Sequence, residues 1–185
     1  MKKLSYFLLS LIILTSGTLV SCTSTKNVQA SGSALESPFT GSEYKSNSTA
    51  LRAVSYGSNA NFATAKKLAF ANAKAQLSSS LEGVIGETTK AYLQKKQISN
   101  TSMENSLNAI VKTAVTNSVD KARRIGDKTI SSNDNYTNWV ALEIPVDIIK
   151  EQINAGIIKD NNLRDSFDLD YYITTFVREA SKKLK

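Results

Sequence analysis

The sequence predicts an α+β fold: a small antiparallel sheet of about three strands packed against a long helical hairpin, with additional C-terminal helices. Two observations predict it. Apolar residues recur at three- and four-residue steps along two long central stretches, which is typical of amphipathic helices. Short runs rich in β-branched and aromatic residues, ended by turn residues, lie before and after those stretches and indicate strands. The predicted order is strand, helix, helix, strand, strand, helix, helix.

Residues 51–56 are the first predicted strand, which Gly57 and the polar residues after it should end. A long helix follows over about residues 61–96. Its apolar stripe consists of Phe62, Ala65, Ala69, Ala73, Leu77, Leu81 and Val84. The alanines at its start predict a close approach to a neighbouring element. Gly83 and Gly86 each cost about 1 kcal/mol relative to alanine inside a helix, so we expect a kink or short break there.

The second helix should begin near Ser102, a fair N-cap, after a short connection at residues 98–102. It carries an amphipathic stripe of Met103, Leu107, Ile110, Val111, Ala114, Ser118 and Ala122. Two helices joined by so short a link are typical of an antiparallel hairpin. Two further strands, 123–132 and 136–144, then flank a predicted turn at Asn133, Asp134 and Asn135.

The last predicted strand alternates in polarity, so its side chains should point to two different faces. Val140, Leu142 and Ile144 share one face, and the other carries Trp139, Ala141 and Glu143. If the hairpin covers the first face, Trp139 has two possible environments. Either the C-terminal helix folds over it, burying Tyr171 or Phe176, or Trp139 belongs to an open face that docks a partner protein.

Pro145 ends this strand and suits the first turn of a short helix over residues 146–153. A polar break at residues 160–162 follows. Asp165 or Ser166 should then cap a final helix whose apolar residues are Phe167, Tyr171, Phe176, Val177, Ala180 and Leu184. We therefore expect one α+β domain over residues 49–158 and a helical extension over residues 159–185.

The N-terminal residues have the organisation of an export signal. Lys2 and Lys3 precede the apolar run 4–14, which is too short to span a bilayer but has the length of a secretory signal core. The sequence Leu19-Val20-Ser21-Cys22 resembles the lipobox of bacterial lipoproteins. That resemblance implies a signal peptide over residues 1–21 and a diacylglycerol thioether on Cys22, the only cysteine.

Two other interpretations of this region are a simple secretory signal cleaved between residues 16 and 21, and a buried structural cysteine. Residues 22–48 are rich in Ser, Thr, Asn and Gly and predict a flexible tether that would span on the order of 30 Å. Thr23 follows the cysteine where an aspartate would favour inner-membrane retention. By the sorting rules of Gram-negative lipoproteins, this implies a cell-envelope protein anchored in the outer membrane and facing the periplasm.

Composition excludes several kinds of chemistry. The chain has no histidine, which excludes Ser-His-Asp and Cys-His catalysis and any zinc site that contains histidine. The formal net charge of +7 is spread over short clusters without interleaved aromatic residues, so no nucleic-acid partner is expected. We predict no catalytic residue, no cofactor and no metal ligand.

Two local motifs bear on that prediction. Ser118 and Lys121 match the S-x-x-K of penicillin-recognising enzymes, but the partner motifs that this chemistry needs are missing from the sequence. Residues 160–170 are rich in oxygen ligands, yet an EF-hand beginning at Asp160 would have Asp165 where glycine is needed and Tyr171 where glutamate is needed. Helix capping accounts better for these acidic residues.

The arrangement resembles a known family. The alanine series at 65, 69 and 73 after a strand ending in Gly57, and the strand 139–145 that closes a hairpin, are similar to the LPP20-type lipoprotein family. The N-terminal domain of the flagellar-ring protein FlgT is of a related type. The resemblance covers about residues 50–155. It implies an α+β domain of the bacterial envelope, often lipid-anchored, without known enzymatic chemistry.

The expected function is therefore non-catalytic: a lipid-anchored envelope protein, held to the membrane through Cys22, that binds other envelope proteins or itself. Trp139 is the candidate residue of its interaction face. The alternative is a periplasmic carrier or sensor of lipid or glycan, with a cavity between helices and sheet. The alanines at the start of the long helix favour close packing over such a pocket. Hydrolysis, which would need Ser-Lys or carboxylate chemistry here, ranks third.

Overall fold

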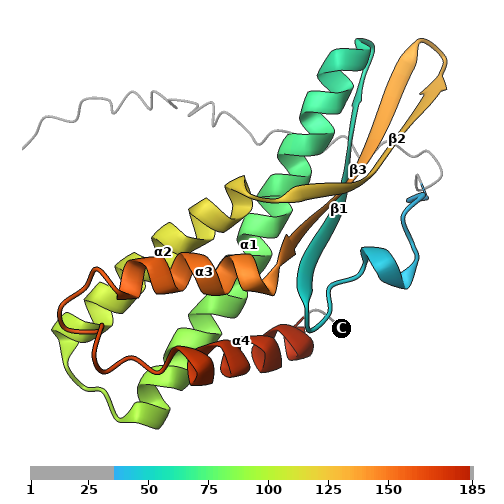
Figure 1. Cartoon of the computed structure of the whole chain (residues 1–185). Coiled ribbons are helices and arrows are strands. Elements are labelled where there is room, and N and C mark those ends of the chain that lie inside the picture. Colours follow the sequence, from blue (N-terminus) through green and yellow to red (C-terminus); the bar gives the residue numbers. More distant parts are fainter. Residues whose placement is uncertain (1–35, 184–185) are drawn as a thin grey trace, which may run out of the picture. The chain divides into compact units, whose positions relative to one another are not determined.

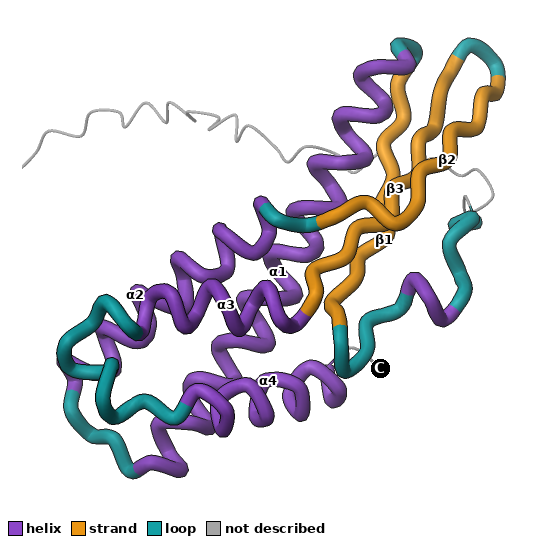
Figure 2. Tube along the Cα trace, in the orientation of Figure 1, coloured by secondary structure: helices purple, strands orange, loops and turns teal. Residues whose placement is uncertain are grey.

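A computed structural model of the chain describes residues 36–183, and the structural statements below refer to that range. Its elements, in chain order, are a 3-10 turn η1 (Ser42–Tyr44), β1 (Ala50–Asn59), α1 (Phe62–Lys96), α2 (Thr101–Asp120), β2 (Arg123–Ser132), β3 (Asn135–Pro145), α3 (Val146–Ile157) and α4 (Leu169–Lys183) (Figures 1 and 2). The predicted α+β fold, with its three-stranded antiparallel sheet and C-terminal helices, is confirmed.

The sheet has the strand order β1-β3-β2, and both pairings are antiparallel. β3 holds the centre, which fits its long run of buried residues. Asn133 and Asp134 have φ values of 46° and 60° and form the tight turn between β2 and β3. The predicted turn is thus confirmed. β1 is longer than expected, because it continues through Gly57 to Asn59.

Gly57 lies inside β1 for a packing reason. A Cβ atom at this position would lie 2.5 Å from the backbone nitrogen of Ala69 and 2.8 Å from the carbonyl oxygen of Ala65. The strand and α1 therefore approach each other so closely that only glycine fits between them. The small residues of α1 make the same approach possible from the other side, since Ala65, Ala69 and Ala73 are fully buried.

α1 runs from Phe62 to Lys96 without interruption, so the predicted short break at Gly83 and Gly86 is wrong. Its start is capped by Asn61, whose side-chain oxygen accepts a hydrogen bond from the Thr64 N–H at 3.0 Å. The first half of α1 packs on β1 and β3, and the second half packs against the other helices (Figure 1). This packing on both halves offsets the roughly 1 kcal/mol that each glycine costs in a helix.

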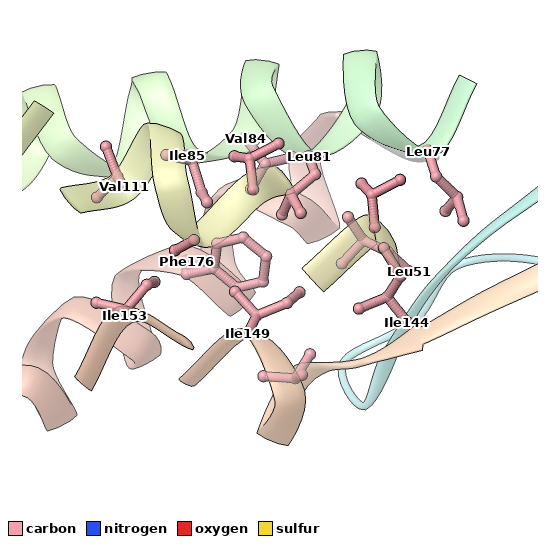
Figure 3. Packing of buried hydrophobic residues seen from close by; sticks show 14 of the residues in the cluster. Leu51, Leu77, Leu81, Val84, Ile85, Val111, Ile144, Ile149, Ile153 and Phe176 are labelled. Atoms are coloured by element: carbon pink, nitrogen blue, oxygen red, sulfur yellow. The ribbon is translucent and has the colours of Figure 1, made fainter. Parts of the chain in front are cut away.

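A single apolar core joins the sheet to the helices. Leu51 and Ile144 from the sheet meet Leu77 and Leu81 of α1, and Phe176 of α4 lies among α1 and α3 side chains (Figure 3). The helices α1 and α2 form the predicted hairpin, but they pack against different elements. α1 covers the sheet, whereas α2 packs mainly against α3 and α1.

The C-terminal elements differ in detail from the prediction. α3 continues to Ile157 instead of ending near 153. α4 begins at Leu169, and the side chain of Asp168 accepts a hydrogen bond from the Tyr171 N–H at 3.0 Å. The cap is therefore Asp168, and the prediction of Asp165 or Ser166 is wrong. Phe62 also departs from its predicted place, because it is 46% exposed at the start of α1.

Candidate functional site

The two faces of the sheet have different surroundings. Strand register places Leu51, Ala53, Gly57, Val140, Leu142 and Ile144 on one face, and α1 covers it. The opposite face, called here the open face, carries Arg52 and Tyr56 of β1, Lys128 and Ile130 of β2, and Trp139, Ala141 and Glu143 of β3. Within residues 36–183, no α-helix packs on the open face.

Trp139 lies at the middle of the open face. Its ring centroid is 4.8 Å from that of Tyr56, its register partner on β1, and Lys128 is its register partner on β2. Trp139 is 6% exposed, while Tyr56 and Ile130 beside it are 44% and 38% exposed. The Trp139 indole N–H is buried without a hydrogen-bond partner. An aromatic and aliphatic surface thus remains accessible around a buried tryptophan.

The prediction that the C-terminal helix covers Trp139 is wrong. α4 packs against α1, where Tyr172 and Phe176 are fully buried, and the Tyr172 hydroxyl lies 2.7 Å from the Thr89 Oγ1. Trp139 instead packs against Tyr56, its register partner on β1. The alternative that the sequence left open, an open face around Trp139, matches this arrangement.

The open face is partly covered by a short N-terminal segment, residues 36–46, called here the strap. A Cβ atom at Gly126 of β2 would lie 2.7 Å from Cε1 of Phe39, so the Phe39 ring lies directly on this glycine. The Phe39 and Tyr44 ring centroids are 4.8 Å apart. Residues 22–48 were predicted to be a flexible tether, whereas residues 36–46 of that stretch contact the sheet.

An ion cluster fixes the end of the strap. Glu143 is 5% exposed and accepts hydrogen bonds from the Arg52 Nε at 2.6 Å and the Arg123 Nε at 2.8 Å. Arg52 also donates to the carbonyl oxygen of Lys45, and the Arg52 N–H donates to the Ser46 hydroxyl. One buried carboxylate thus orients the arginine that binds the strap.

The protonation of Glu143 follows from these contacts. Burial alone would raise the pKa of this carboxyl, but the hydrogen bonds from Arg123 and Arg52 and their charges hold the pKa below its ordinary value. Glu143 is therefore ionised at neutral pH. The cluster joins all three strands at one end of the sheet, because Arg52 lies on β1, Arg123 on β2 and Glu143 on β3.

A groove lies away from the sheet, near the connection between the two helices of the hairpin. This groove between α1 and α2 has a volume of about 700 Å³. Its lining includes Leu93 and Ile98 together with polar side chains such as Lys90, Glu104 and Asn108. A Cβ atom at Gly86 would meet nothing within 4 Å, so this glycine leaves open space in the groove.

The other residues singled out from the sequence do not gather into a site. Ser118 is fully buried within α2, and its hydroxyl has no hydrogen-bond partner. Asp160 accepts hydrogen bonds from the N–H groups of Asn162 and Leu163, as a turn residue does. In the described part of the chain, no cluster of three acidic, histidine or cysteine side chains is placed to hold a metal ion. Cys22 and the predicted signal peptide lie outside the described residues.

Sequence reasoning missed the contact between Phe39 and Gly126. Two signals for it were present. Phe39 and Tyr44 are aromatic residues in an otherwise small and polar segment, and Gly126 interrupts a predicted strand, which often marks a bulge or a close approach. The structure has a register shift between Arg124 and Gly126, as this rule indicates.

No family model, curated protein or solved structure matches this chain. The similarity to LPP20-type lipoproteins therefore stays a prediction from the sequence. Across residues 36–183, none of the helices combines the length and the apolar character needed to cross a bilayer.

Proposed function

We propose that this protein is a lipid-anchored component of the bacterial envelope that works by binding protein partners, other envelope proteins or itself. The observation that carries this proposal is the open face of the sheet. Tyr56 and Ile130 are exposed there beside Trp139, and aromatic residues of this kind are enriched in protein interfaces. The lipobox-like sequence before Cys22 supports the placement at a membrane, with the outer membrane as the proposed location.

The anchor is tested by Cys22→Ser. The unchanged chain is expected in the membrane fraction, because each buried methylene of an acyl chain contributes about 0.8 kcal/mol and several chains hold a protein firmly. Cys22→Ser should move the protein to the soluble fraction. Recovery of the unchanged chain as a soluble protein with a free thiol, shown by mass spectrometry, would overturn the anchor.

The binding role is tested by photo-crosslinking in intact cells. A photoreactive amino acid replaces Tyr56 on the open face, and a control chain carries it at the exposed Lys112 of α2. We expect a defined protein neighbour or a second copy of the chain to be captured from position 56 and not from position 112. A protein captured equally from both positions, or no reproducible product, would contradict binding through the open face.

A second function, carriage or sensing of a lipid or glycan, is favoured by one specific observation, the groove between α1 and α2. Its volume of about 700 Å³ lies within the range of small-molecule sites. It is placed within the hairpin, whereas the sequence led us to expect it between helices and sheet. Gly86→Leu should narrow it, since a Cβ atom there meets nothing within 4 Å and the larger side chain would take up space in the groove.

The matched control for this second function is Gly86→Ala, which keeps most of the groove open. If the groove holds a ligand, extraction and mass spectrometry should find that ligand with the unchanged chain and with Gly86→Ala, and lose it with Gly86→Leu. Identical extracts from all three proteins would exclude the groove as a carrier site.

A further inference from the structure

The open face contains a hollow that fits an aromatic ring. Gly126 of β2 and Ala141 of β3 are register partners, so a residue without a side chain lies next to one whose side chain is a single methyl group. Phe39 of the strap fills the space above them. Its ring lies so close that a Cβ atom at Gly126 would be 2.7 Å from Cε1 and 2.8 Å from Cζ. We call this hollow, formed by Gly126 and Ala141, the slot.

Charge also matches the strap to the open face. The strap carries two acidic residues, Glu36 and Glu43, and one basic residue, Lys45. The open face carries Arg52, Arg123 and Lys128, and its acidic residue Glu143 is bound to both arginines. An acidic segment therefore lies on a face with an excess of positive charge, which favours their association.

The strap is held by few contacts. Its 3-10 turn has no buried residue, and its hydrogen bonds to β1 come from Lys45 and Ser46 at its C-terminal end. The hinge that follows is a turn in which the Asn47 side chain accepts hydrogen bonds from the N–H groups of Thr49 and Ala50. A segment with so few buried contacts opens more readily than the core.

We propose that the slot also binds the strap of a second copy, so that the protein self-associates by exchanging straps. The occupant follows from the structure, because the strap is already complementary to the slot in shape and charge. The monomer and the exchanged dimer make the same contacts outside the hinge, so exchange is a low-cost route to a dimer. This inference rests on the proposed function, since copies anchored to one membrane meet at a high local concentration.

The exchange is tested by crosslinking between two differently tagged full-length copies made in the same cell. One copy carries Thr40→Cys in the strap, and the other carries Lys128→Cys on the open face; both positions are exposed. A short bis-maleimide should join the two tags. The control pairs Thr40→Cys with Lys112→Cys on α2, which should give little mixed product.

Two variants then identify the slot as the site. Phe39→Ala in the copy with Thr40→Cys should lower the mixed-tag product about tenfold, because it removes the aromatic side chain that fills the slot. Gly126→Ala in the copy with Lys128→Cys should do the same, because the added Cβ takes the space of the ring. Gly86→Ala, where nothing lies within 4 Å, should leave the product unchanged. Circular dichroism of each purified variant shows that it is folded.

Two results would overturn the exchange. One is a mixed-tag product that neither Phe39→Ala nor Gly126→Ala lowers. The other is the absence of a mixed-tag product while a single chain carrying both cysteines crosslinks internally. In either case the proposed binding function still stands if position 56 captures another envelope protein. The failure of the binding function is separate: it is seen when position 56 captures no reproducible product, or only a protein that position 112 captures equally.

Discussion

Three glycines show how differently one residue type acts in this fold. Gly57 lets a helix backbone approach β1, and Gly126 leaves room for the Phe39 ring. Gly86 does neither, because a Cβ atom there would meet only open space. A glycine within a helix or strand costs stability relative to alanine, so the first two are explained by packing and the third is not.

Gly57→Ala and Gly86→Ala should therefore change stability in opposite directions. At Gly57 the added carbon would meet backbone atoms of α1, which cannot move aside, and overpacking of this kind costs about 1–3 kcal/mol or more. At Gly86 alanine should stabilise the protein by about 1 kcal/mol, because it is the better helix former. Urea unfolding of the Cys22→Ser protein measures both. A stabilising Gly57→Ala would show that the contact with α1 is not as close as described.

Glu143 makes stability depend on pH. Its pKa is lower in the folded protein than in the unfolded chain, so its contribution is fully present above the unfolded pKa of about 4.5 and is lost as the pH falls toward the folded pKa. Asp127 acts in the same direction. Burial would raise its pKa, but the hydrogen bond from Asn138 and the charges of Lys66 and Arg124 lower it overall.

Glu143→Gln should cost about 3 kcal/mol at pH 7, the low end for breaking a buried ion pair, because Arg123 is 67% exposed and stays solvated. The fall in the free energy of unfolding below about pH 4.5 should also be smaller in this variant. Part of that fall should remain, because Asp127 contributes to it as well. Urea unfolding between pH 3 and pH 7 tests both effects. A variant with the pH dependence of the unchanged protein would assign that dependence to other carboxyls.

At the scale of elements, α4 is attached to α1 by an aromatic cluster with specific polar contacts. Tyr92 of α1 packs against Phe167 and Tyr172, and its hydroxyl accepts a hydrogen bond from the Asp168 N–H at 2.9 Å. Tyr172 is fully buried, and burial raises its pKa despite the hydrogen bond with Thr89. The C-terminal extension is therefore an integral part of the core.

Tyr172→Phe tests this attachment. The change keeps the ring but leaves the buried Thr89 hydroxyl without the partner it has here, which should cost about 1–3 kcal/mol. Tyr171→Phe is the matched control, because Tyr171 lies on the same helix and is only half-buried. Its effect should be close to zero. Equal effects of the two substitutions in urea unfolding would contradict a specific role for the hydrogen bond.

At the scale of the molecule, α1 belongs to both halves of the core. Its first half is buried against the sheet and its second half against α2 and α4, so the sheet has no apolar core separate from the helices. Within residues 36–183 the strap is the one segment that lies on the open face and outside this shared core.

The shared core predicts cooperative unfolding. The fluorescence of Trp139, the only tryptophan, reports on the sheet, and far-ultraviolet circular dichroism reports mainly on the helices. In the Cys22→Ser protein the two signals should follow one transition in urea with the same midpoint, as expected for a two-state domain of this size. Loss of Trp139 burial at a clearly lower urea concentration would show that the sheet melts before the helices.

Local patterns in the sequence were enough to predict most of the elements. The step of three to four residues located α1 and α2, the alternation in residues 139–144 located β3, and the residues 133–135 located its turn. The alanines of α1 correctly predicted a close approach. These features depend on neighbours in sequence, which is why periodicity and turn chemistry identify them.

Tertiary structure alone decided how these elements cover one another. Helix α1 stays continuous through Gly83 and Gly86 because packing along its whole length outweighs their cost. Trp139 packs against Tyr56 of β1 and not under α4, and Phe39 lies on Gly126, 87 positions further along the chain. A pattern of apolar residues shows that a face is buried, but the segment that buries it is chosen by shape and charge across distant parts of the chain.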